Sequence, residues 1–486
     1  MRYVLTAEQI REAERRIIDG GVDETFLRFN AALAIADGIV ERAGEVGAKT
    51  AVFCGAGGNG CDGILAAARL KRLGKEVAVY AVGKCAEANA AAFKYAKSAG
   101  VPVRDASEYD GDATVIVDAI FGIGLNRAVA GDIAALIDRL NAQQNAFKLA
   151  VDIPSGLNAD TGEQMGTAFK AHVTLSFSCY KLGMLFGAGR DACGRILVED
   201  VGIPVKSDIA VCEDGDFKPY KRKASAHKGV SGRAYIIGGC GAMIGAPVLA
   251  GAAAHAAHLN GAGTVTLCLP SVHRVSLTSR AVLSMMKFLC DDKDGFIKFD
   301  RAALDEIIEK ADAVDIGMGM GGAPDLKRIL AYINANYDGV LVIDADALNA
   351  IGGDYEFLKD GKAKRILTPH VGEFRRLTGR DATVENAKKL ATAVGGVVVL
   401  KSATTIVTDG VTTRLNVTGT PAMAKGGTGD VLGGCITALA CAYSPLDAAT
   451  IACYRNGLGA ERAVSSYAEM MLTPYDILHL ANYPEV

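Results

Sequence analysis

Residues 49–72 read "KTAVFCGAGGNGCDGILAAARLKR". A short run of strand-forming residues precedes a glycine-rich turn, and an Ala/Leu-rich helical stretch follows it. Gly55, Gly57 and Gly60 have the spacing of a dinucleotide-binding turn between a parallel strand and a helix. The segment predicts a doubly wound, Rossmann-like α/β fold for the first half of the chain.

The residues that follow do not favour an ordinary NAD-dependent dehydrogenase. Such an enzyme carries an acidic residue about 20 positions after the turn, where it binds the ribose hydroxyls. Here the next strand ends as "VAVYAVGKC", residues 77–85, without Asp or Glu. A tight turn with close helix packing is one alternative. Asn59 and Asp62 are not needed for such a turn, and they predict ligand contacts instead.

Strand-like and helical stretches alternate along the whole chain, which is typical of parallel sheets. Thr6 and Gln9 form a capping-box pattern that predicts a helix through Ile18. The predicted strands of the first half are 49–54, 76–82, 113–118 and 148–153. Those of the second half are 232–239, 263–269, 313–319, 339–346, 364–370 and 396–402.

The polar segment "CEDGDFKPYKRKAS", residues 212–225, lacks periodicity and predicts a linker. We therefore expect one domain over residues 1–212, a linker over 213–225 and a second α/β domain over 226–486. The two halves have different glycine signatures, which indicates a fusion of unlike domains and not a duplication.

Composition excludes several classes of function. Lys plus Arg total 52 and Asp plus Glu total 55, a balance that predicts no nucleic-acid partner and no membrane anchor. The 12 cysteines are scattered singly, and residues 1–16 lack the apolar core of a signal peptide. Gly, Pro and His interrupt the apolar stretch 234–259, so a membrane span is not expected. We expect a cytoplasmic homo-oligomer that acts on small molecules.

Two further predicted strands end in aspartate, at Asp118 and Asp152. Ligands of open parallel sheets bind beyond the carboxyl ends of the strands, so these residues and Asp62 are expected to converge on one crevice. Each aspartate by itself is equally well explained as a helix or turn cap. Three such residues together favour a binding site.

The first half resembles the NAD(P)H-hydrate epimerase domain in "GAGGNGCDG" (55–63), "VDAIFGIGL" (117–125), "VDIPSGLNADTG" (151–162), "HVTLSFSCYKLGM" (172–184) and "VEDVGIP" (198–204). The resemblance implies that a hydrated nicotinamide nucleotide is the substrate and that K⁺ is bound by Asn59, Asp118 and Ser155. It implies substrate contacts from Gly58, Asn59, Gly60, Cys61, Asp62, Gly122, Ile123, Gly124, Leu125, Asn126, Arg127 and Ala128. Asp152 is the candidate general base. Lys181 also matches a lysine of the family, although a solvated surface lysine is an equal alternative.

The sequence departs from that family at two places. The family loop is usually Asn-Asn-Gly-Gly-Asp, whereas residues 58–62 read Gly-Asn-Gly-Cys-Asp. The early "MENAG" of many relatives is replaced by "RFNAA", Arg28 to Ala32. Both changes remove substrate contacts, so a binding module without epimerase activity is an alternative for this domain.

In the second half, "MAKGGTGDVLGGCITALAC", residues 423–441, carries the strongest local signal. A glycine-rich helix start offers free N–H groups to phosphate oxygens. Asp430 at that start is either a helix cap or a base that deprotonates a hydroxyl beside the transferred phosphoryl group. The motif alone leaves both interpretations open.

Six further motifs resemble, in order, the ADP-dependent NAD(P)H-hydrate dehydratase, a relative of ribokinase-like kinases. They are "HKGVSGRAYIIGG" (227–239), "NGAGTVTL" (260–267), "DIGMGMGG" (315–322), "VIDADALNA" (342–350), "LTPHVGEFRRL" (367–377) and "VVVLKSATTIV" (397–407). The resemblance implies hydrate contacts from Ala262, Gly319 and His370. It implies nucleotide contacts from Lys401, Ser402, Ala403, Thr404, Thr405 and Gly429, and a catalytic role for Asp430.

The resemblance implies a bifunctional repair enzyme for NADHX and NADPHX. The first domain would interconvert the R and S hydrates. The second, with Mg²⁺ and ADP as co-substrate, would dehydrate the S form to NAD(P)H with release of AMP and phosphate. A ribokinase-like kinase for a small molecule is the alternative for the second domain.

Overall fold

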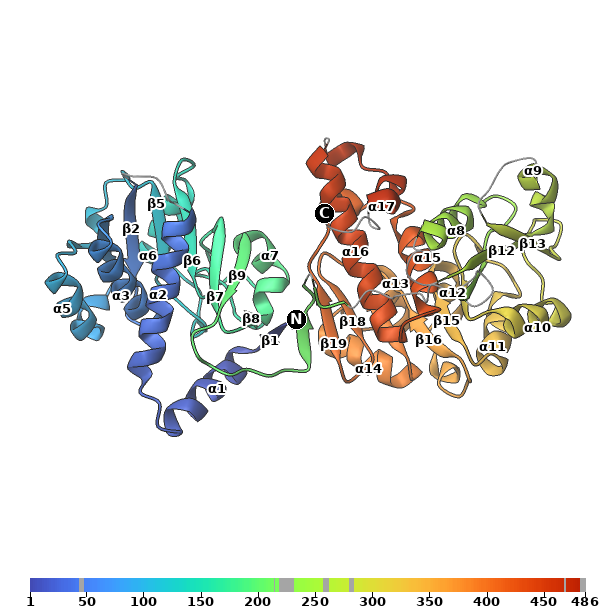
Figure 1. Ribbon diagram of the computed structural model, residues 1–486, viewed down its shortest axis with the longest axis horizontal. Coiled ribbons are helices and arrows are strands. Elements are labelled where there is room, and N and C mark those ends of the chain that lie inside the picture. Colours follow the sequence, from blue (N-terminus) through green and yellow to red (C-terminus); the bar gives the residue numbers. More distant parts are fainter. Residues whose placement is uncertain are drawn as a thin grey trace. The chain divides into compact units, whose positions relative to one another are not determined.

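The computed structural model describes residues 1–42, 48–213, 215–217, 231–256, 262–278, 284–466 and 469–480. The chain divides into two compact units, Arg2–Ile209 and Ala210–Val486, and Met1 groups with the second (Figure 1). Most of the expected linker, 213–225, lies outside the described residues. Its bounds therefore stay a prediction.

The N-terminal unit is built on seven parallel strands in the order β4-β3-β2-β5-β6-β7-β9. Its strands are β1 (Arg2–Leu5), β2 (Lys49–Cys54), β3 (Glu76–Ala81), β4 (Val103–Asp105), β5 (Val115–Ala119), β6 (Phe147–Val151), β7 (Val173–Phe177), β8 (Tyr180–Lys181) and β9 (Arg195–Glu199). Its helices are α1 (Ala7–Asp19), α2 (Glu24–Arg42), α3 (Gly58–Arg72), α4 (Cys85–Ala88), α5 (Ala90–Ser98), α6 (Gly131–Asn141) and α7 (Ala188–Ala192). The order reverses between β2 and β5, which is the doubly wound arrangement expected from the sequence.

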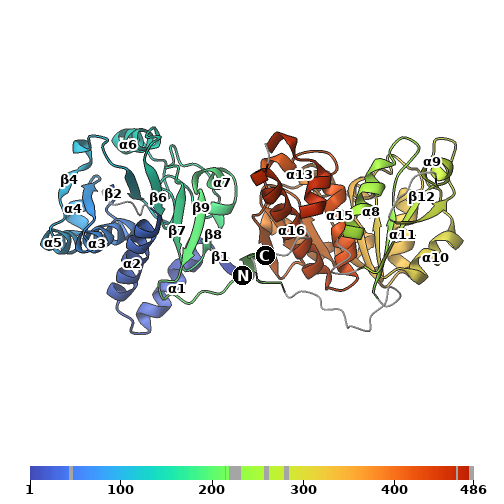
Figure 2. The same cartoon turned by 45° about the horizontal axis from the view of Figure 1, so that its top comes forward.

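Helices cover both faces of this sheet (Figure 2). Helices α2, α3 and α5 pack on one face with Val52 and Val117, whereas Ile137 and Leu140 of α6 pack on the other face with Phe53. Strands β1 and β8 form a separate parallel pair. The predicted capping box is confirmed, because the Thr6 side chain accepts from the N–H of Gln9 at the start of α1.

The C-terminal unit contains the strand order β13-β12-β11-β14-β15-β16-β17-β18-β19. Its strands are β11 (Arg233–Ile237), β12 (Thr264–Pro270), β13 (Met285–Leu289), β14 (Ala313–Ile316), β15 (Val340–Ile343), β16 (Lys364–Leu367), β17 (Val397–Leu400), β18 (Thr405–Thr408) and β19 (Thr413–Asn416); β10 (Ile209–Val211) spans the division between the units. Its helices are α8 (Gly245–Ala256), α9 (Arg274–Thr278), α10 (Arg301–Lys310), α11 (Leu326–Asn336), α12 (Ala345–Ile351), α13 (Val371–Thr378), α14 (Val384–Val394), α15 (Thr428–Ala440), α16 (Pro445–Ser466) and α17 (Pro474–Leu480). Strands β18 and β19 are antiparallel additions to a parallel sheet.

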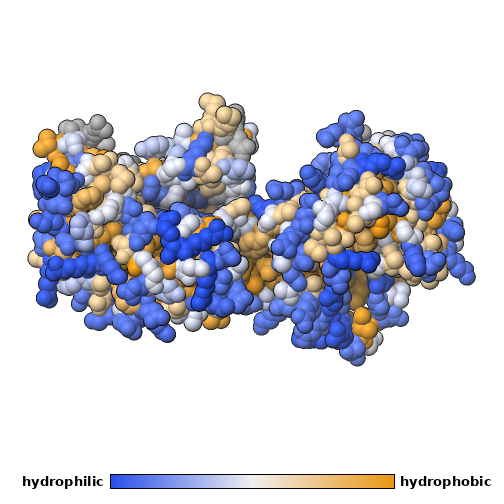
Figure 3. All heavy atoms as spheres, turned by 180° about the vertical axis from the view of Figure 1, so that it is seen from behind, coloured by the Kyte–Doolittle hydropathy of each residue, from blue (hydrophilic) through white to orange (hydrophobic). Residues whose placement is uncertain are grey.

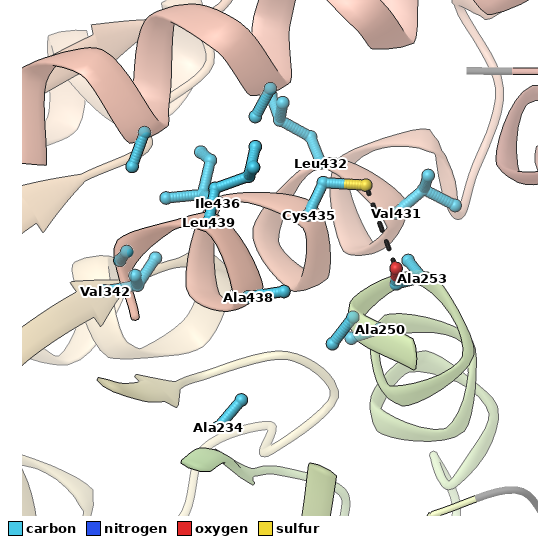
Figure 4. Packing of buried hydrophobic residues seen from close by; sticks show 14 of the residues in the cluster. Ala234, Ala250, Ala253, Val342, Val431, Leu432, Cys435, Ile436, Ala438 and Leu439 are labelled. Atoms are coloured by element: carbon cyan, nitrogen blue, oxygen red, sulfur yellow. Dashed lines mark hydrogen bonds between the residues drawn. The ribbon is translucent and has the colours of Figure 1, made fainter. Parts of the chain in front are cut away.

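Helix α15 is the centre of the hydrophobic core of this unit (Figure 4). Val431, Cys435 and Ile436 are buried between the sheet and the neighbouring helices. Gly434 faces α8, and a Cβ at this position would lie 2.0 Å from the carbonyl oxygen of Ala250. Glycine is therefore required there, because the two helix backbones approach too closely for any side chain.

The predicted strands are all present, but most end earlier than the sequence suggested. The observed β6 ends at Val151, and Asp152 already has a φ of 65°, outside the strand region. Likewise β15 ends at Ile343, and α12 begins at Ala345. Hydrophobic periodicity does not mark the point at which a buried strand turns into a loop that carries a site.

Hydrophilic residues cover much of the face shown in Figure 3, with apolar residues interspersed among them. Among the helices that the structure describes, none has the length and the apolar composition that a membrane crossing requires.

Candidate functional site

The glycine turn after β2 packs against the segment that follows β5. A Cβ on Gly55 would lie 1.9 Å from the carbonyl oxygen of Ile120, and a Cβ on Gly60 would lie 1.9 Å from that of Gly55. The N–H of Gly55 donates to the carbonyl of Ala119 at 3.0 Å. Gly55 therefore brings two loops into backbone contact at the point where the strand order reverses, and Gly60 allows the start of α3 to lie close to Gly55.

Asp118, Ser155 and Asn59 come together at this contact. Ser155 Oγ and its N–H donate to the two carboxylate oxygens of Asp118 at 2.6 and 2.7 Å. The amide nitrogen of Asn59 donates to the carbonyls of Phe121 and Val151 at 3.0 and 2.9 Å. Burial raises the pKa of Asp118 to about 6, and the hydrogen bonds from Ser155 oppose that shift.

This cluster contains the kind of oxygen set that potassium prefers. K⁺ binds several neutral and anionic oxygens, including main-chain carbonyls. The carbonyls of Phe121 and Val151 converge on the Asn59 amide, and Ser155 Oγ lies 3.4 Å from the Phe121 oxygen and beside the buried Asp118 carboxylate. The residues present therefore fit the ion that the resemblance implies.

Asp152 and Lys181 form a buried ion pair next to this cluster. A φ of 65° at a residue that is not glycine costs about 1–3 kcal/mol, and surrounding contacts must offset it. The Asp152 N–H donates to the carbonyl of Leu175 at 2.7 Å, and the carboxylate accepts from the ammonium of Lys181. Lys181 also donates to Ser176 Oγ at 2.9 Å and is fully buried. It is thus a partner of Asp152 and not a solvated surface lysine.

A cavity of about 630 Å³ contains Asp152 and Lys181 in its wall. The expected substrate-contact residues that line it are Gly58, Asn59, Asp62, Gly122, Ile123, Gly124, Leu125, Asn126 and Arg127. Three other expected residues, Gly60, Cys61 and Ala128, do not line it. Gly60 serves the contact with Gly55 described above.

The same cavity includes charged residues that sequence reasoning did not assign to a site. Glu14 on α1 and Glu24 and Arg28 on α2 line it. Burial raises the pKa of Glu14, and the nearby Asp152 carboxylate raises it further. No motif marks Glu14, because its spacing on α1 is that of any polar position on an amphipathic helix. Only the docking of α1 brings it to the cavity.

In the C-terminal unit, Asp430 lies in the first turn of α15. The residue before the helix, Gly427, has a φ of 96°, which glycine adopts without strain. Burial raises the pKa of Asp430 to about 6; the Asp344 carboxylate raises it further, and Lys401 lowers it. A base with a pKa near 6 is ionised at neutral pH.

Lys401 connects this helix start to the end of strand β15. Its Nζ donates to Asp344 Oδ1 at 3.0 Å, and Thr368 Oγ1 donates to the same oxygen at 2.6 Å. A Cβ on Gly429 would lie 3.6 Å from the Lys401 Nζ. The expected nucleotide-binding residues Lys401 and Gly429 are therefore neighbours, and Asp430 adjoins them.

The remaining expected residues have structural contacts of their own. His370 caps α13, because its Nδ1 accepts from the N–H groups of Gly372 and Glu373 at 2.9 and 3.2 Å. It also forms a parallel bridge with Lys401. Gly319 has a φ of 65°, and Ala262 is fully buried in the hydrophobic core. Residues Ser402, Ala403, Thr404 and Thr405 form the turn into β18 and its first residue, where Thr405 Oγ1 donates to the Ser402 carbonyl at 3.2 Å.

Two family models match the chain, and each corresponds to one unit. The model described as NAD(P)H-hydrate dehydratase matches residues 234–481, and the one described as YjeF-related protein N-terminus matches residues 25–183. The bifunctional NAD(P)H-hydrate repair enzyme Nnr of Hyperthermus butylicus is 33% identical over 94% of this chain and 88% of its own length. The chain belongs to the bifunctional NAD(P)H-hydrate repair enzyme family. The resemblance drawn from the motifs and the expected two-part α/β fold class are thereby confirmed.

Solved structures are similar to part of this chain. An ADP/ATP-dependent NAD(P)H-hydrate dehydratase from Bacillus subtilis, co-crystallised with ATP/Mg²⁺, is 28% identical, with a TM-score of 0.47 over 54% of this chain and 91% of that chain. A ribokinase-like superfamily protein from Enterococcus faecalis is 24% identical, with a TM-score of 0.45 over 54% of this chain and 89% of that chain.

Asp315 is a buried carboxyl group that opens the motif "DIGMGMGG" (315–322) but to which the resemblance assigns no role. It lies on β14 with no exposed surface, and among the described residues neither of its side-chain oxygens has a hydrogen-bond partner. A Cβ on Gly433 of α15 would lie 3.0 Å from one Asp315 oxygen and 3.5 Å from Asp344 Oδ2. Burial raises the pKa of Asp315 well above its usual value, and the Asp344 carboxylate adds to the shift. Both effects favour the protonated form of Asp315, whereas Thr437 and Lys401 oppose the shift.

We expect Gly55→Ala to destabilise the N-terminal unit, because the new Cβ would overlap the Ile120 carbonyl oxygen. Overpacking of this kind costs about 1–3 kcal/mol. Differential scanning calorimetry should show a lower melting temperature for one of two transitions. Gly124→Ala is the control, since no atom lies within 4 Å of its Cβ position. Equal melting temperatures for the two variants would contradict the assigned contact.

We expect Asp315→Asn to stabilise the C-terminal unit in a pH-dependent way. Because burial raises the pKa of folded Asp315 above that of the unfolded chain, wild-type stability falls as the pH rises from about 4 towards the folded pKa, by up to about 1.4 kcal/mol per pH unit. Asparagine removes this loss. The melting temperature of the variant should therefore exceed that of wild type at about pH 8, and the difference should vanish near pH 4. The exposed Asp338→Asn serves as control. A difference that does not depend on pH would contradict protonation of Asp315.

Proposed function

We propose that this chain repairs hydrated nicotinamide nucleotides in two steps. The N-terminal unit interconverts the R and S forms of NADHX and NADPHX. The C-terminal unit dehydrates the S form to NAD(P)H and converts ADP to AMP and phosphate. The observation that carries the proposal is the similarity to a bifunctional repair enzyme along 94% of the chain. In agreement with it, Asp152 and Asp430 both lie at the carboxyl edge of their sheets.

In the N-terminal unit, inversion requires a proton to leave and return at or beside the hydrated ring carbon. Asp152 is the proposed base, because its carboxylate faces the cavity. It is also paired with the ammonium group of Lys181, and among the described residues no other aspartate at this sheet edge has an ammonium group as close. Lys181 fixes the orientation of the carboxylate through a direct hydrogen bond. The strained φ of Asp152 turns the side chain out of the strand and toward the substrate.

Potassium is the proposed ion of this unit, held by Asn59, Asp118 and Ser155 with the carbonyls of Phe121 and Val151. When bound there, K⁺ would supply positive charge at the loop contact next to the substrate. Asn59 and its two carbonyl partners connect the segments after β2, β5 and β6, so these residues hold the three loops at a fixed separation.

In the C-terminal unit, Asp430 accepts the proton of the hydrate hydroxyl, and the hydroxyl oxygen then attacks the terminal phosphorus of ADP. The ammonium of Lys401 and the free N–H groups at the start of α15 stabilise the charge on the phosphoryl group. The hydroxyl is thereby converted into a phosphate ester, and AMP leaves. Elimination of phosphate with loss of a neighbouring proton restores the dihydronicotinamide ring.

Magnesium is proposed to enter with the nucleotide. Mg²⁺ is usually bound by substrate phosphates, waters and one or two carboxylates, not by a cage of protein ligands. Accordingly, the described residues contain no group of three or more His, Cys, Asp or Glu side chains arranged to hold a metal ion. A bound Mg²⁺ ion would neutralise the charge of the phosphate groups and orient the phosphoryl group that is transferred.

The test is recovery of NADH absorbance from a mixture of both hydrate epimers, with ADP and magnesium present. Wild type should convert the whole mixture, Asp152→Ala should stop after the S form is used, and Asp430→Ala should lower the rate about 10²–10⁴-fold. Wild type that stops at half conversion would make the N-terminal unit a binding module. Accumulation of a phosphorylated product without NADH would instead identify a kinase, and repetition with ATP tests the nucleotide preference.

The pH dependence of dehydration tests Asp430 as the base. Because its pKa is raised to about 6, the ionised form is lost below that pH, and kcat/KM for NADH formation should fall about tenfold per pH unit there. The pure S epimer should be used, so that inversion does not limit the rate. A profile that is flat between about pH 5 and 8 would contradict this role.

A further inference from the structure

The side chain of Arg28 occupies space that opens because residue 58 is glycine. Arg28 lies on α2, and Gly58 is the first residue of α3. A Cβ on Gly58 would lie 2.8 Å from Arg28 Nη1 and 3.0 Å from Nη2. Any larger residue at position 58 would displace the guanidinium. Positions 28 and 58 are therefore coupled in this chain.

Both positions depart from the family pattern, and they depart together. The resemblance implies methionine where this chain has Arg28 and asparagine where it has Gly58. In this chain the guanidinium of Arg28 on α2 lies in the space beside Gly58. The guanidinium adds a positive charge, which an asparagine amide does not carry.

Arg28 keeps hydrogen-bond donors available for a ligand. Its Nη1 donates to Asp62 Oδ1 at 3.2 Å, and its Nη2 donates to Glu24. A guanidinium group has five N–H donors, so these two bonds leave others unused. The side chain is about one-third exposed, at 31%, and it lies in the wall of the cavity that contains Asp152.

The cavity wall contains several carboxyl groups, so the positive charge of Arg28 matters for the binding of an anionic ligand. Four carboxyl groups line the cavity, those of Glu14, Glu24, Asp62 and Asp152. Three cations besides Arg28 line the cavity. Lys181 is paired with Asp152, Arg11 donates to the carbonyl of Ile123 at 3.1 Å, and Arg127 lies in the segment after β5, whereas Arg28 lies against the start of α3. A substrate with phosphate groups is repelled by these carboxylates unless a cation lies close by.

We propose that Arg28, in the space beside Gly58, binds a phosphate group of the nucleotide substrate in the N-terminal cavity. The proposal rests on the proposed function, because it takes the ligand to be a phosphate-bearing nucleotide hydrate. Arginine suits this role, since its planar fork forms two charge-assisted hydrogen bonds with phosphate. The competing explanation is that Arg28 only neutralises Asp62.

Binding is measured by isothermal titration of the full chain with R-NADHX, without ADP and in an Asp152→Ala background that prevents inversion. Because the C-terminal unit takes the S form, we expect one binding event, that of the N-terminal unit. Arg28→Met should weaken this event about tenfold, as expected for the loss of charge-assisted hydrogen bonds. Arg16→Met is the matched control, because Arg16 is on α1, pairs with Glu12 and is largely exposed.

The coupling between the two positions gives a second and independent readout. Gly58→Asn alone should weaken the same event, because its Cβ displaces the guanidinium. The double variant Arg28→Met with Gly58→Asn restores the family pair and should bind more tightly than Gly58→Asn alone. Kinetic assays of inversion with Asp152 intact should show that Arg28→Met raises KM about tenfold and changes kcat less than about twofold.

Other outcomes would overturn the proposal. If Arg28→Met binds as tightly as wild type, or lowers kcat with KM unchanged, Arg28 acts on Asp62 alone. If Gly58→Asn binds like wild type, the steric coupling is wrong. If R-NADHX does not bind with Arg28 and Gly58 intact, the N-terminal unit does not bind the hydrate, and this result overturns the epimerase function together with this proposal.

Discussion

A carboxylate buried at the end of a parallel strand must find a cation or hydrogen-bond donors, and both units of this chain are organised around that requirement. An unpaired buried charge costs several kcal/mol, so each such aspartate fixes the position of its partner. In the N-terminal unit Asp152 is paired with Lys181, and in the C-terminal unit Asp344 is paired with Lys401. Both lysines come from later segments of the chain. Each pair therefore ties distant segments together at the sheet edge where ligands bind.

Glycines affect the packing of both units in two different ways. Gly55, Gly60 and Gly434 allow backbone segments to touch, and a side chain at any of them would overlap a carbonyl oxygen. Gly58 has a different effect, because the atoms that fill the space beside it belong to the long and flexible Arg28 side chain. The first kind of glycine is required by the fold. The second kind determines which side chain faces the cavity.

The two aspartates that we propose as bases, Asp152 and Asp430, also differ in what holds them in place. Asp430 lies in the first turn of a helix whose glycine-rich start is visible in the sequence, whereas the burial that raises its pKa comes from the packing around α15. Asp152 leaves its strand in a conformation that only surrounding hydrogen bonds hold in place. The resemblance assigns His370 to the substrate. His370 also caps α13 and adjoins Lys401, so it stabilises the helix start and lies at the edge of the proposed site.

The sequence by itself determined the alternation of strands and helices, the two-part organisation, the glycine turns and the aspartates at strand ends, because these features depend on local periodicity and short spacings. The tertiary structure alone decided that Lys181 is buried, that Glu14 and Arg28 reach the cavity, and that Asp315 lies without hydrogen-bond partners among the described residues. These facts depend on contacts between residues far apart in the chain. Ion pairing and burial are set by which elements pack together, and neither residue spacing nor hydrophobic periodicity carries that information.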